Sequence, residues 1–297
     1  MNPREKGFLL LSCRLGNADR RPLTQAQLQT LAKRVQGMKR PADNRDLSRE
    51  DLMELGYTAQ MADHILQLLS QEEMVQYYCS QGEKIGCKPV TWASPAYPGL
   101  LRQRLGTQSP GCLWAKGDLS LLGETAVSLV GSRDLEGENR RFAEAVGVMA
   151  ARKGLVLVSG NARGADKAAQ QACLEAGGRV ICVVADDLSR QPEHSRILYL
   201  SEDGFREGFS AQRALSRNRC IHALGQITFV AQSTKGKGGT WSGTVKNLNH
   251  GWSSVVCFRD GSNASLELEQ MGAYLMGIED LWDITLPSSH QTSFFTD

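Results

Sequence analysis

The sequence lacks any hydrophobic run long enough to cross a membrane. The apolar run near its start follows a basic flank and is only about five residues long, too short for a secretion signal or a membrane span. No other stretch approaches the roughly 18 apolar residues that a span needs. We therefore expect a cytoplasmic protein with no membrane partner.

The sequence also lacks a large excess of charge of either sign. Its 297 residues include 34 Lys and Arg against 32 Asp and Glu, a net charge of +2. A surface for nucleic acid would therefore depend on local clustering of basic residues. With 41% hydrophobic and 22% charged residues, the composition is that of a globular protein with a sizeable core, and the length suggests about two domains.

Several chemical signatures are missing as well. None of the eight cysteines forms a C-x-x-C pair, and Cys182 and Cys257 lie in apolar runs, which indicates reduced, buried thiols rather than a zinc site. The five histidines include no H-E-x-x-H motif, and no G-x-x-x-x-G-K-[ST] loop for ATP is present. We expect no metal and no cofactor.

The first 85 residues show helical periodicity. Ser48, followed by Glu50 and Asp51, suits the start of a helix. Apolar residues then recur at spacings of three and four, namely Leu52, Leu55, Ile65, Leu66, Leu68 and Leu69. We predict a helical accessory domain over 1–85, joined to the rest by a proline-containing connector over 86–125.

From about residue 126, short β-rich runs alternate with amphipathic helices. The runs predict strands at 126–130, 155–159, 179–185, 197–201, 227–231 and 254–258, with helices near 138–153, 165–176, 211–224, 243–249 and 264–276. Continuous apolar strands separated by helices indicate a parallel sheet covered on both faces. The predicted fold class is α/β, a Rossmann-like, doubly wound, mostly parallel sheet over 126–286, followed by a C-terminal tail at 287–297. The ligand crevice of such a fold lies at the carboxyl ends of its strands.

Two predicted strands end in glycine turns that carry an arginine. Glycine allows close approach of a ligand to the backbone, and the helix that follows presents free N–H groups to an anion. The guanidinium groups would add bidentate phosphate contacts. A single glycine turn is more often only a turn, but two on adjacent strands favour an anion site. The residues concerned are Gly131, Ser132, Arg133, Gly160, Arg163 and Gly164.

Two further segments are basic. Residues 203–239 carry six basic and two acidic side chains, which gives this segment a local charge of +4. Within it, Arg217, Asn218 and Arg219 form one cluster that we expect to be exposed. A charge run is usually a solvated face, but this one follows a predicted strand end. The other segment is a glycine-rich turn that opens a helix and suits an anion cradle, with Lys235, Lys237, Gly239 and Thr240. The adjoining Trp241 is compatible with base stacking and with packing.

These stretches resemble the DprA/Smf family of bacterial DNA-processing proteins over about residues 50–260. The matching stretches, in family order, are Tyr97-Pro98, Lys116-Gly117-Asp118, AVSLVGSR at 126–133, SGNARGAD at 159–166, Ser201-Glu202 and Arg217-Asn218-Arg219. The sequence departs from the family pattern at 230–232 and in the longer turn at 235–244, which indicates a divergent member.

The resemblance implies a non-enzymatic protein that binds single-stranded DNA through phosphate pockets, in recombination, DNA uptake or phage defence. It also implies a homodimer and a RecA-type recombinase as partner. The DNA-contacting residues implied by position are Gly131, Ser132, Arg133, Gly160, Arg163, Gly164, Arg217, Asn218 and Arg219. Asp166 and Glu202 would orient those basic groups.

Two alternatives use the same crevice. Phosphoribohydrolases of a related fold carry a "GG.GT.EE" turn, which 238–247 resembles, but Lys246 and Asn247 stand where the glutamates would be. A cation there would oppose the positive charge that develops in such a hydrolysis, so binding is favoured over catalysis. A sensor of a nucleotide derivative is the third possibility.

Overall fold

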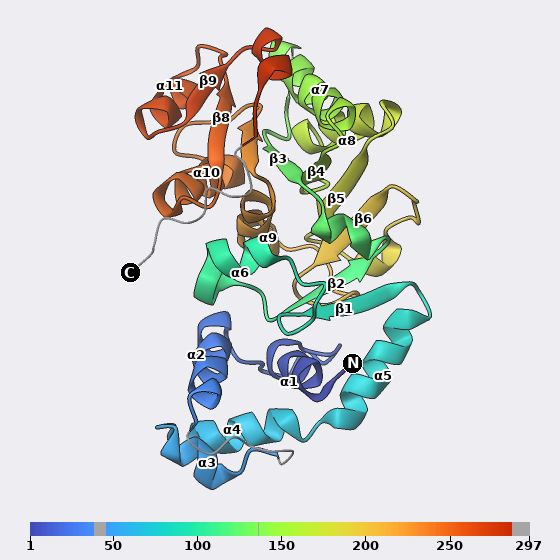
Figure 1. Ribbon diagram of the computed structural model, residues 1–297, viewed down its shortest axis with the longest axis vertical. Coiled ribbons are helices and arrows are strands. Elements are labelled where there is room, and N and C mark those ends of the chain that lie inside the picture. The colour runs from blue at the N-terminus through green and yellow to red at the C-terminus, as the bar shows by residue number, and fades with distance from the viewer. Residues whose placement is uncertain (39–45, 136, 287–297) are drawn as a thin grey trace. The chain divides into compact units, whose positions relative to one another are not determined.

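The computed structural model describes residues 1–38, 46–135 and 137–286, which form two compact units (Figure 1). The helical unit comprises Met1–Lys116, Asp186–Pro192 and Leu200–Gly208. The described part of the Rossmann-like unit comprises Gly117–Ala185, Glu193–Tyr199 and residues 209–286. The predicted tail at 287–297 lies outside the described residues.

Five helices form most of the helical unit, and four of them begin at a capping side chain. They are α1 (Pro3–Ser12), α2 (Gln25–Gln36), α3 (Arg49–Glu54), α4 (Ala59–Leu69) and α5 (Glu72–Glu83). The predicted helix start at Ser48 is confirmed. Its hydroxyl accepts a hydrogen bond from Asp51 N at 3.1 Å, and the Asp51 carboxylate accepts one from Ser48 N at 2.8 Å. This reciprocal pair satisfies two backbone groups that the first turn leaves open.

The core of the helical unit is the apolar face that the leucine spacing predicts. Leu52, Ile65 and Leu68 are buried in one cluster with residues of α1 and α2, while Leu66 and Leu69 pack at its edge. Phe8 stacks on Trp92 with ring centroids 5.5 Å apart. Burial of such side chains, rather than helix propensity, is what holds short helices together.

The segment predicted as a connector, 86–125, contains regular secondary structure. It contains β1 (Cys87–Thr91), α6 (Gly99–Leu105), η1 (Gly106–Gln108), β2 (Cys112–Lys116) and η2 (Leu119–Gly123). The strands β1 and β2 pair antiparallel, with Val90 opposite Leu113. Pro89 is tolerated in β1 because this is an edge strand, where a missing N–H need not break a ladder. The helical unit therefore extends well past residue 85.

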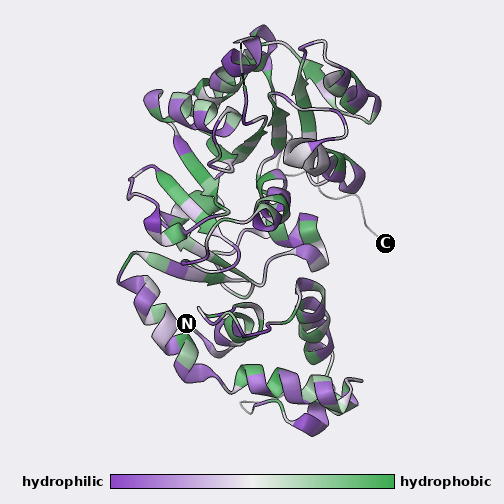
Figure 2. Cartoon of the chain, turned by 180° about the vertical axis from the view of Figure 1, so that it is seen from behind, coloured by the Kyte–Doolittle hydropathy of each residue, from purple (hydrophilic) through white to green (hydrophobic). Residues whose placement is uncertain are grey.

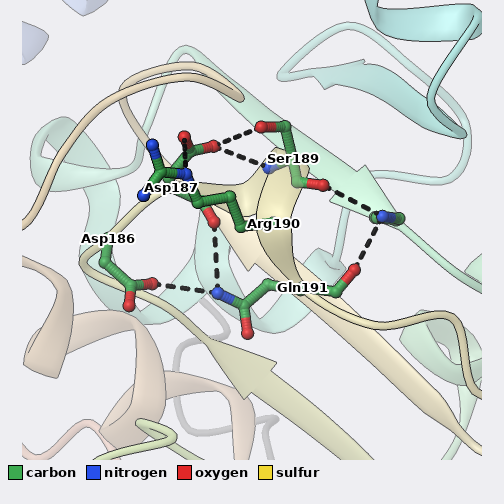
Figure 3. Close-up of polar contacts among 6 residues, drawn as sticks. Asp186, Asp187, Ser189, Arg190 and Gln191 are labelled. Atoms are coloured by element: carbon green, nitrogen blue, oxygen red, sulfur yellow. Dashed lines mark hydrogen bonds and ion pairs between the residues drawn. The ribbon is translucent and has the colours of Figure 1, made fainter.

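A buried lysine at the end of β2 fixes the segment 186–192 within the helical unit (Figure 3). Lys116 Nζ donates to the carbonyl oxygens of Ser189 at 3.2 Å and Gln191 at 2.7 Å. Asp187 begins η3 (Leu188–Arg190) by accepting from Ser189 N at 2.9 Å, and Gln191 Nε2 donates to Asp186 Oδ1 at 3.1 Å. Lys116, the first residue of the Lys-Gly-Asp motif, thus has a structural role.

The Rossmann-like unit has the predicted α/β fold. Its strands are β3 (Ala126–Val130), β4 (Val156–Ser159), β5 (Arg179–Val183), β6 (Ile197–Ser201, whose last two residues belong to the helical unit), β7 (Ile227–Val230), β8 (Ser254–Phe258) and β9 (Tyr274–Met276). Its helices are α7 (Gly137–Arg152), α8 (Ala165–Glu175), α9 (Ala211–Leu224), α10 (Gly238–His250) and α11 (Asn263–Gln270), with η4 (Glu279–Asp283). Three strands and α9 have the bounds predicted from sequence.

The strand order β6-β5-β4-β3-β7-β8-β9 places the switch in chain direction between β3 and β7. From β3, the chain moves outward through β4 and β5 on one side and from β7 through β8 and β9 on the other, with these pairs parallel. Ligands of such sheets bind outside the carboxyl ends of the strands at this switch point.

Helices α7 and α8 pack on each other, as do α9 and α10, so that the sheet is covered on both faces. The strands between them consist largely of hydrophobic residues, and the helices expose hydrophilic ones (Figure 2). All eight cysteines are free, and all but Cys79 are buried. No helix among the described residues is long and apolar enough to cross a membrane.

Two predicted boundaries of this unit are wrong. The helix expected over 264–276 ends at Gln270, and β9 follows, because Gly272 at φ 107° turns the chain back to the sheet edge. Helix α10 begins at Gly238 rather than near residue 243. Its glycine-rich start, which sequence propensity assigns to a loop, is the first helical turn.

Candidate functional site

A pocket of about 430 Å³ lies at the carboxyl ends of β3 and β7, at the switch point of the sheet. It is lined from the turn after β3, the segment after β7, α9 and the start of α10. The predicted site residues among its lining are Gly131, Ser132, Arg133, Asp166, Arg217, Asn218, Lys237, Gly239 and Thr240.

The start of α10 lines this pocket and has no side-chain cap. Lys237 precedes the first turn, and no side chain caps that turn. The N–H groups of an uncapped first turn and the positive end of the helix dipole favour a negative ligand. Thr240 Oγ1 donates to Gly131 O at 2.9 Å, and Asn218 Nδ2 donates to Gly239 O at 3.2 Å. These bonds hold the turn against β3 and α9.

The turn after β4, by contrast, already holds an anion of its own. The Asp166 carboxylate accepts hydrogen bonds from Gly160 N and Ala162 N, each at 3.1 Å, and Asp166 is only 6% exposed. Burial raises the pKa of Asp166, and the charge of Arg217 and the two backbone donors oppose this rise. The predicted phosphate cradle at this turn is thus filled by the chain itself.

Gly164 serves the packing of the two glycine turns on one another. Its φ is 79°, and a Cβ there would collide with the carbonyl oxygens of Ser132 and Arg133. Ala165 N donates to Ser132 O at 3.1 Å. The glycine therefore allows close contact between the turns after β3 and β4, which shapes the pocket wall without itself lining the pocket.

Arg217 is buried, so its predicted exposure is wrong. It is 8% exposed, and its Nη2 donates to Gly160 O at 2.9 Å. A Cβ at Gly160 would collide with its guanidinium group. Arg217 supplies a positive charge to the pocket lining, acts on Asp166 and holds the turn after β4.

The exposed cations of the pocket are Arg133 and Lys237. The Arg133 guanidinium lies 5.8 Å from the ring centroid of Phe209, which is 59% exposed. At the rim, Arg163 Nη2 lies 3.0 Å from Asp134 Oδ1, and both side chains are exposed. Asp134 lines the pocket, so Arg163 neutralises a carboxylate that would otherwise repel an anion there.

Some predicted residues lie outside the lining. Arg219 donates to Ser216 one turn back on α9, and Lys235 forms an ion pair with Glu267. Gly160, Arg163, Gly164 and Glu202 complete this set. Trp241 is half-buried and likewise does not line the pocket.

Sequence reasoning missed the segment after β7 and the apolar residues near the pocket mouth. Gln232 and Ser233 line the pocket, and Gln232 Oε1 and Ser233 Oγ are buried without a hydrogen-bond partner. Leu215 of α9 lines the pocket with its side chain exposed. The signal for 232–233 was their place directly after a strand that neighbours β3.

Lys246 and Asn247, which stand where phosphoribohydrolases have glutamates, do not line the pocket. Asn247 is buried; its Nδ2 donates to His222 Nδ1 at 3.2 Å and its Oδ1 accepts from Ser253 N at 2.9 Å. Lys246 is exposed on α10 and absent from the lining. Burial lowers the pKa of His222 to about 3, so this imidazole is neutral near pH 7.

Comparison with known proteins bears on this site. The family model described as DNA recombination-mediator protein A matches residues 88–254, which is more than half of the chain. The chain therefore belongs to this family. The matched span includes β3 to β7 and the whole pocket lining.

Relatives agree with this assignment. DNA processing protein DprA of Streptococcus pneumoniae (strain ATCC BAA-255 / R6) is 33% identical over 135 residues, 42% of this chain and 48% of the relative, so the match spans about half of the relative's length. The X-ray structure of DNA processing protein A from Streptococcus pneumoniae superposes with a TM-score of 0.69, covering 88% of this chain and 98% of that chain at 24% identity. The structure of DNA processing protein A from Helicobacter pylori superposes with a TM-score of 0.54, covering 66% of this chain and 93% of that chain at 21% identity. These structures share the fold.

Proposed function

We propose that the chain binds single-stranded DNA, with a backbone phosphate at the start of α10. The observation that carries this proposal is the pocket itself, where an uncapped helix start meets the exposed cations Arg133 and Lys237. Helix N–H groups and guanidinium forks are suited to phosphate oxygens. The Helicobacter pylori relative has a single-stranded DNA binding mode, which supports the same ligand here.

The residues beside the cations suit the bases of a strand. Phe209 offers an exposed ring next to Arg133, and Leu215 an exposed apolar side chain on α9. Bases of a single strand stack on such side chains, whereas paired bases in a duplex are not available. Gln232 and Ser233 also line the pocket, although Gln232 Oε1 and Ser233 Oγ are themselves buried. The proposal therefore includes a preference for single strands over duplexes.

The proposed function is binding without catalysis. N-glycosidic hydrolysis needs a carboxylate beside the sugar to stabilise positive charge. Of the carboxylates of the pocket, Asp166 is committed to backbone N–H groups and Asp134 to Arg163. The bonds to Asp166 and the positive charge beside Asp134 both disfavour that task.

The family resemblance extends the proposal to partners. A homodimer and a contact with a RecA-type recombinase would fit a role in recombination or DNA uptake. Light scattering of the purified chain tests the homodimer, and a monomer at all concentrations would remove the dimer from the proposal. Co-purification with a recombinase tests the recombinase contact.

The binding proposal is tested by fluorescence anisotropy with a labelled single strand, its duplex and a mononucleotide. We expect tight binding of the single strand, weak binding of the other two, and a loss of about tenfold or more in Arg133→Ala Lys237→Ala. The matched control is Arg140→Ala Lys246→Ala, which removes the same charge from exposed positions of α7 and α10 outside the lining.

Two outcomes would contradict the proposal. Equal losses in the two double variants would show that total charge, rather than this pocket, determines affinity. Mononucleotide binding as tight as strand binding would favour the nucleotide sensor, whose single ligand the pocket volume also suits.

A further inference from the structure

A second cavity, of about 340 Å³, lies within the helical unit. Three segments line it: the turn after α1 with Arg14 and Leu15, the middle of α5 with Tyr77, Tyr78 and Gln81, and the segment with Arg206 and Glu207. It shares no residue with the pocket of the Rossmann-like unit. Its volume is in the range of cavities that hold one small ligand.

The floor of this cavity is rigid. Tyr78 is buried and stacks on Phe205 with ring centroids 4.3 Å apart. Its ring is nearly perpendicular to that of Trp114, with ring centroids 5.1 Å apart. Phe205 N donates to the Tyr78 hydroxyl at 3.3 Å. A floor held by three aromatic rings and a backbone hydrogen bond does not collapse into the space above it.

The wall contributes an exposed aromatic ring. Tyr77 is 68% exposed and makes no ring contact with any residue that the structure describes. It comes directly before Tyr78 on α5 and lines the same cavity. An exposed ring at the mouth of a cavity is a platform on which a flat group of a ligand can stack.

The cavity also carries two arginines. Arg14 and Arg206 are exposed, and neither forms an ion pair within the described ranges. Arg206 lies over Phe205 at 5.5 Å, which holds it near the cavity. Arg14 is followed by Leu15, a buried non-glycine residue at φ 54°. Such strained backbone persists only where its surroundings enforce it, and it fixes the direction of this turn.

We propose that this cavity binds one nucleotide unit, with its base stacked on Tyr77 and its phosphate held by Arg14 and Arg206. Two guanidinium forks suit a phosphate, and a ring beside them suits an aromatic base, so the lining matches both halves of a nucleotide. The Gln81 amide is available to the edge of the base. A free nucleotide and a unit of a DNA strand share this chemistry.

The test uses the full chain with Arg133→Ala Lys237→Ala as background, which removes cations from the other pocket. Deoxyadenosine monophosphate and a labelled oligonucleotide are titrated separately, by calorimetry and by anisotropy. We expect Tyr77→Ala to weaken binding about fivefold or more, and Arg14→Ala Arg206→Ala about tenfold or more. Tyr77→Phe keeps the ring and should bind normally, as should Arg4→Ala, an exposed arginine of α1 outside the cavity.

The outcomes separate the sources of the ligand. An effect with the mononucleotide assigns a free nucleotide, and an effect with the oligonucleotide alone assigns a strand. Binding that Tyr77→Ala and Arg14→Ala Arg206→Ala leave unchanged, with unaltered melting temperatures, overturns the proposal. Failure here leaves the single-strand proposal standing, because that proposal is decided by Arg133 and Lys237 in the otherwise unaltered chain.

Discussion

Arg217→Met is expected to unfold the Rossmann-like unit more easily rather than merely to weaken binding. Arg217 is 8% exposed and Asp166 6% exposed, and the charge of the arginine acts on that carboxyl. Methionine keeps most of the volume but removes the charge and the hydrogen bond to Gly160 O. Asp166 would then be left buried without the stronger of the two positive charges that act on it, those of Arg217 and Arg133.

The magnitude follows from that loss. Removing one partner of a buried charge pair costs about 3–5 kcal/mol, out of a total stability of roughly 5–15 kcal/mol. At roughly 2–4 °C per kcal/mol for a domain of this size, the melting temperature should fall by about 6–20 °C. Arg133→Ala, at an exposed position, should change stability by no more than about 0.5 kcal/mol.

The assay is thermal and urea unfolding of Arg217→Met, Asp166→Asn and the double variant, followed by circular dichroism. Because the two residues act on one another, the double variant should be less destabilised than the sum of the single variants, by about 1–3 kcal/mol. A melting temperature for Arg217→Met within about 2 °C of the parent, or strictly additive effects, would refute this assignment.

Three further predictions concern the stability of the fold. Lys116→Met should destabilise the helical unit by about 2 kcal/mol or more, because two carbonyl groups lose their donor, and proteolysis should then reach the segment 186–192 first. Gly164→Ala should lower the melting temperature by several degrees, since its Cβ collides with the turn after β3; an unchanged value would contradict that packing. His222 should contribute to acid unfolding: its pKa of about 3 lies below the usual value, so only the unfolded chain takes up its proton as the pH falls from about 6.5 toward 3. The free energy of unfolding should then fall by up to about 1.4 kcal/mol per pH unit from this group, and a urea-unfolding series of His222→Gln should show a shallower fall than the parent.

The strands of the Rossmann-like unit could be predicted because they are continuous apolar runs buried on both faces. The bounds of β3, β6 and β8 follow directly from such runs. β1 and β2 could not be predicted in this way, because Pro89 is incompatible with a central strand and nothing local marks an edge strand. β9 could not be predicted because its three residues follow α11 with no change in the spacing of apolar residues.

The position of the pocket could be predicted from the sequence, but the contacts of its residues could not. The sequence predicts exposed side chains for Arg133 and Arg217 alike, yet Arg133 is exposed and Arg217 is buried against Gly160. A carboxylate two residues after a glycine gives no sign that it will fill the anion position at its own helix start, as Asp166 does. Such roles depend on contacts between turns far apart in sequence.

The central claim is that phosphates of a single strand bind where α10 begins. The most direct measurement is the salt dependence of oligonucleotide affinity, between about 50 and 300 mM salt, for the parent chain and Arg133→Ala Lys237→Ala. The account predicts a log–log slope of about −0.7 per phosphate contacted, and a slope shallower by about 0.7–1.4 in the double variant. Identical slopes for the two proteins, or affinity that does not respond to salt, would contradict it.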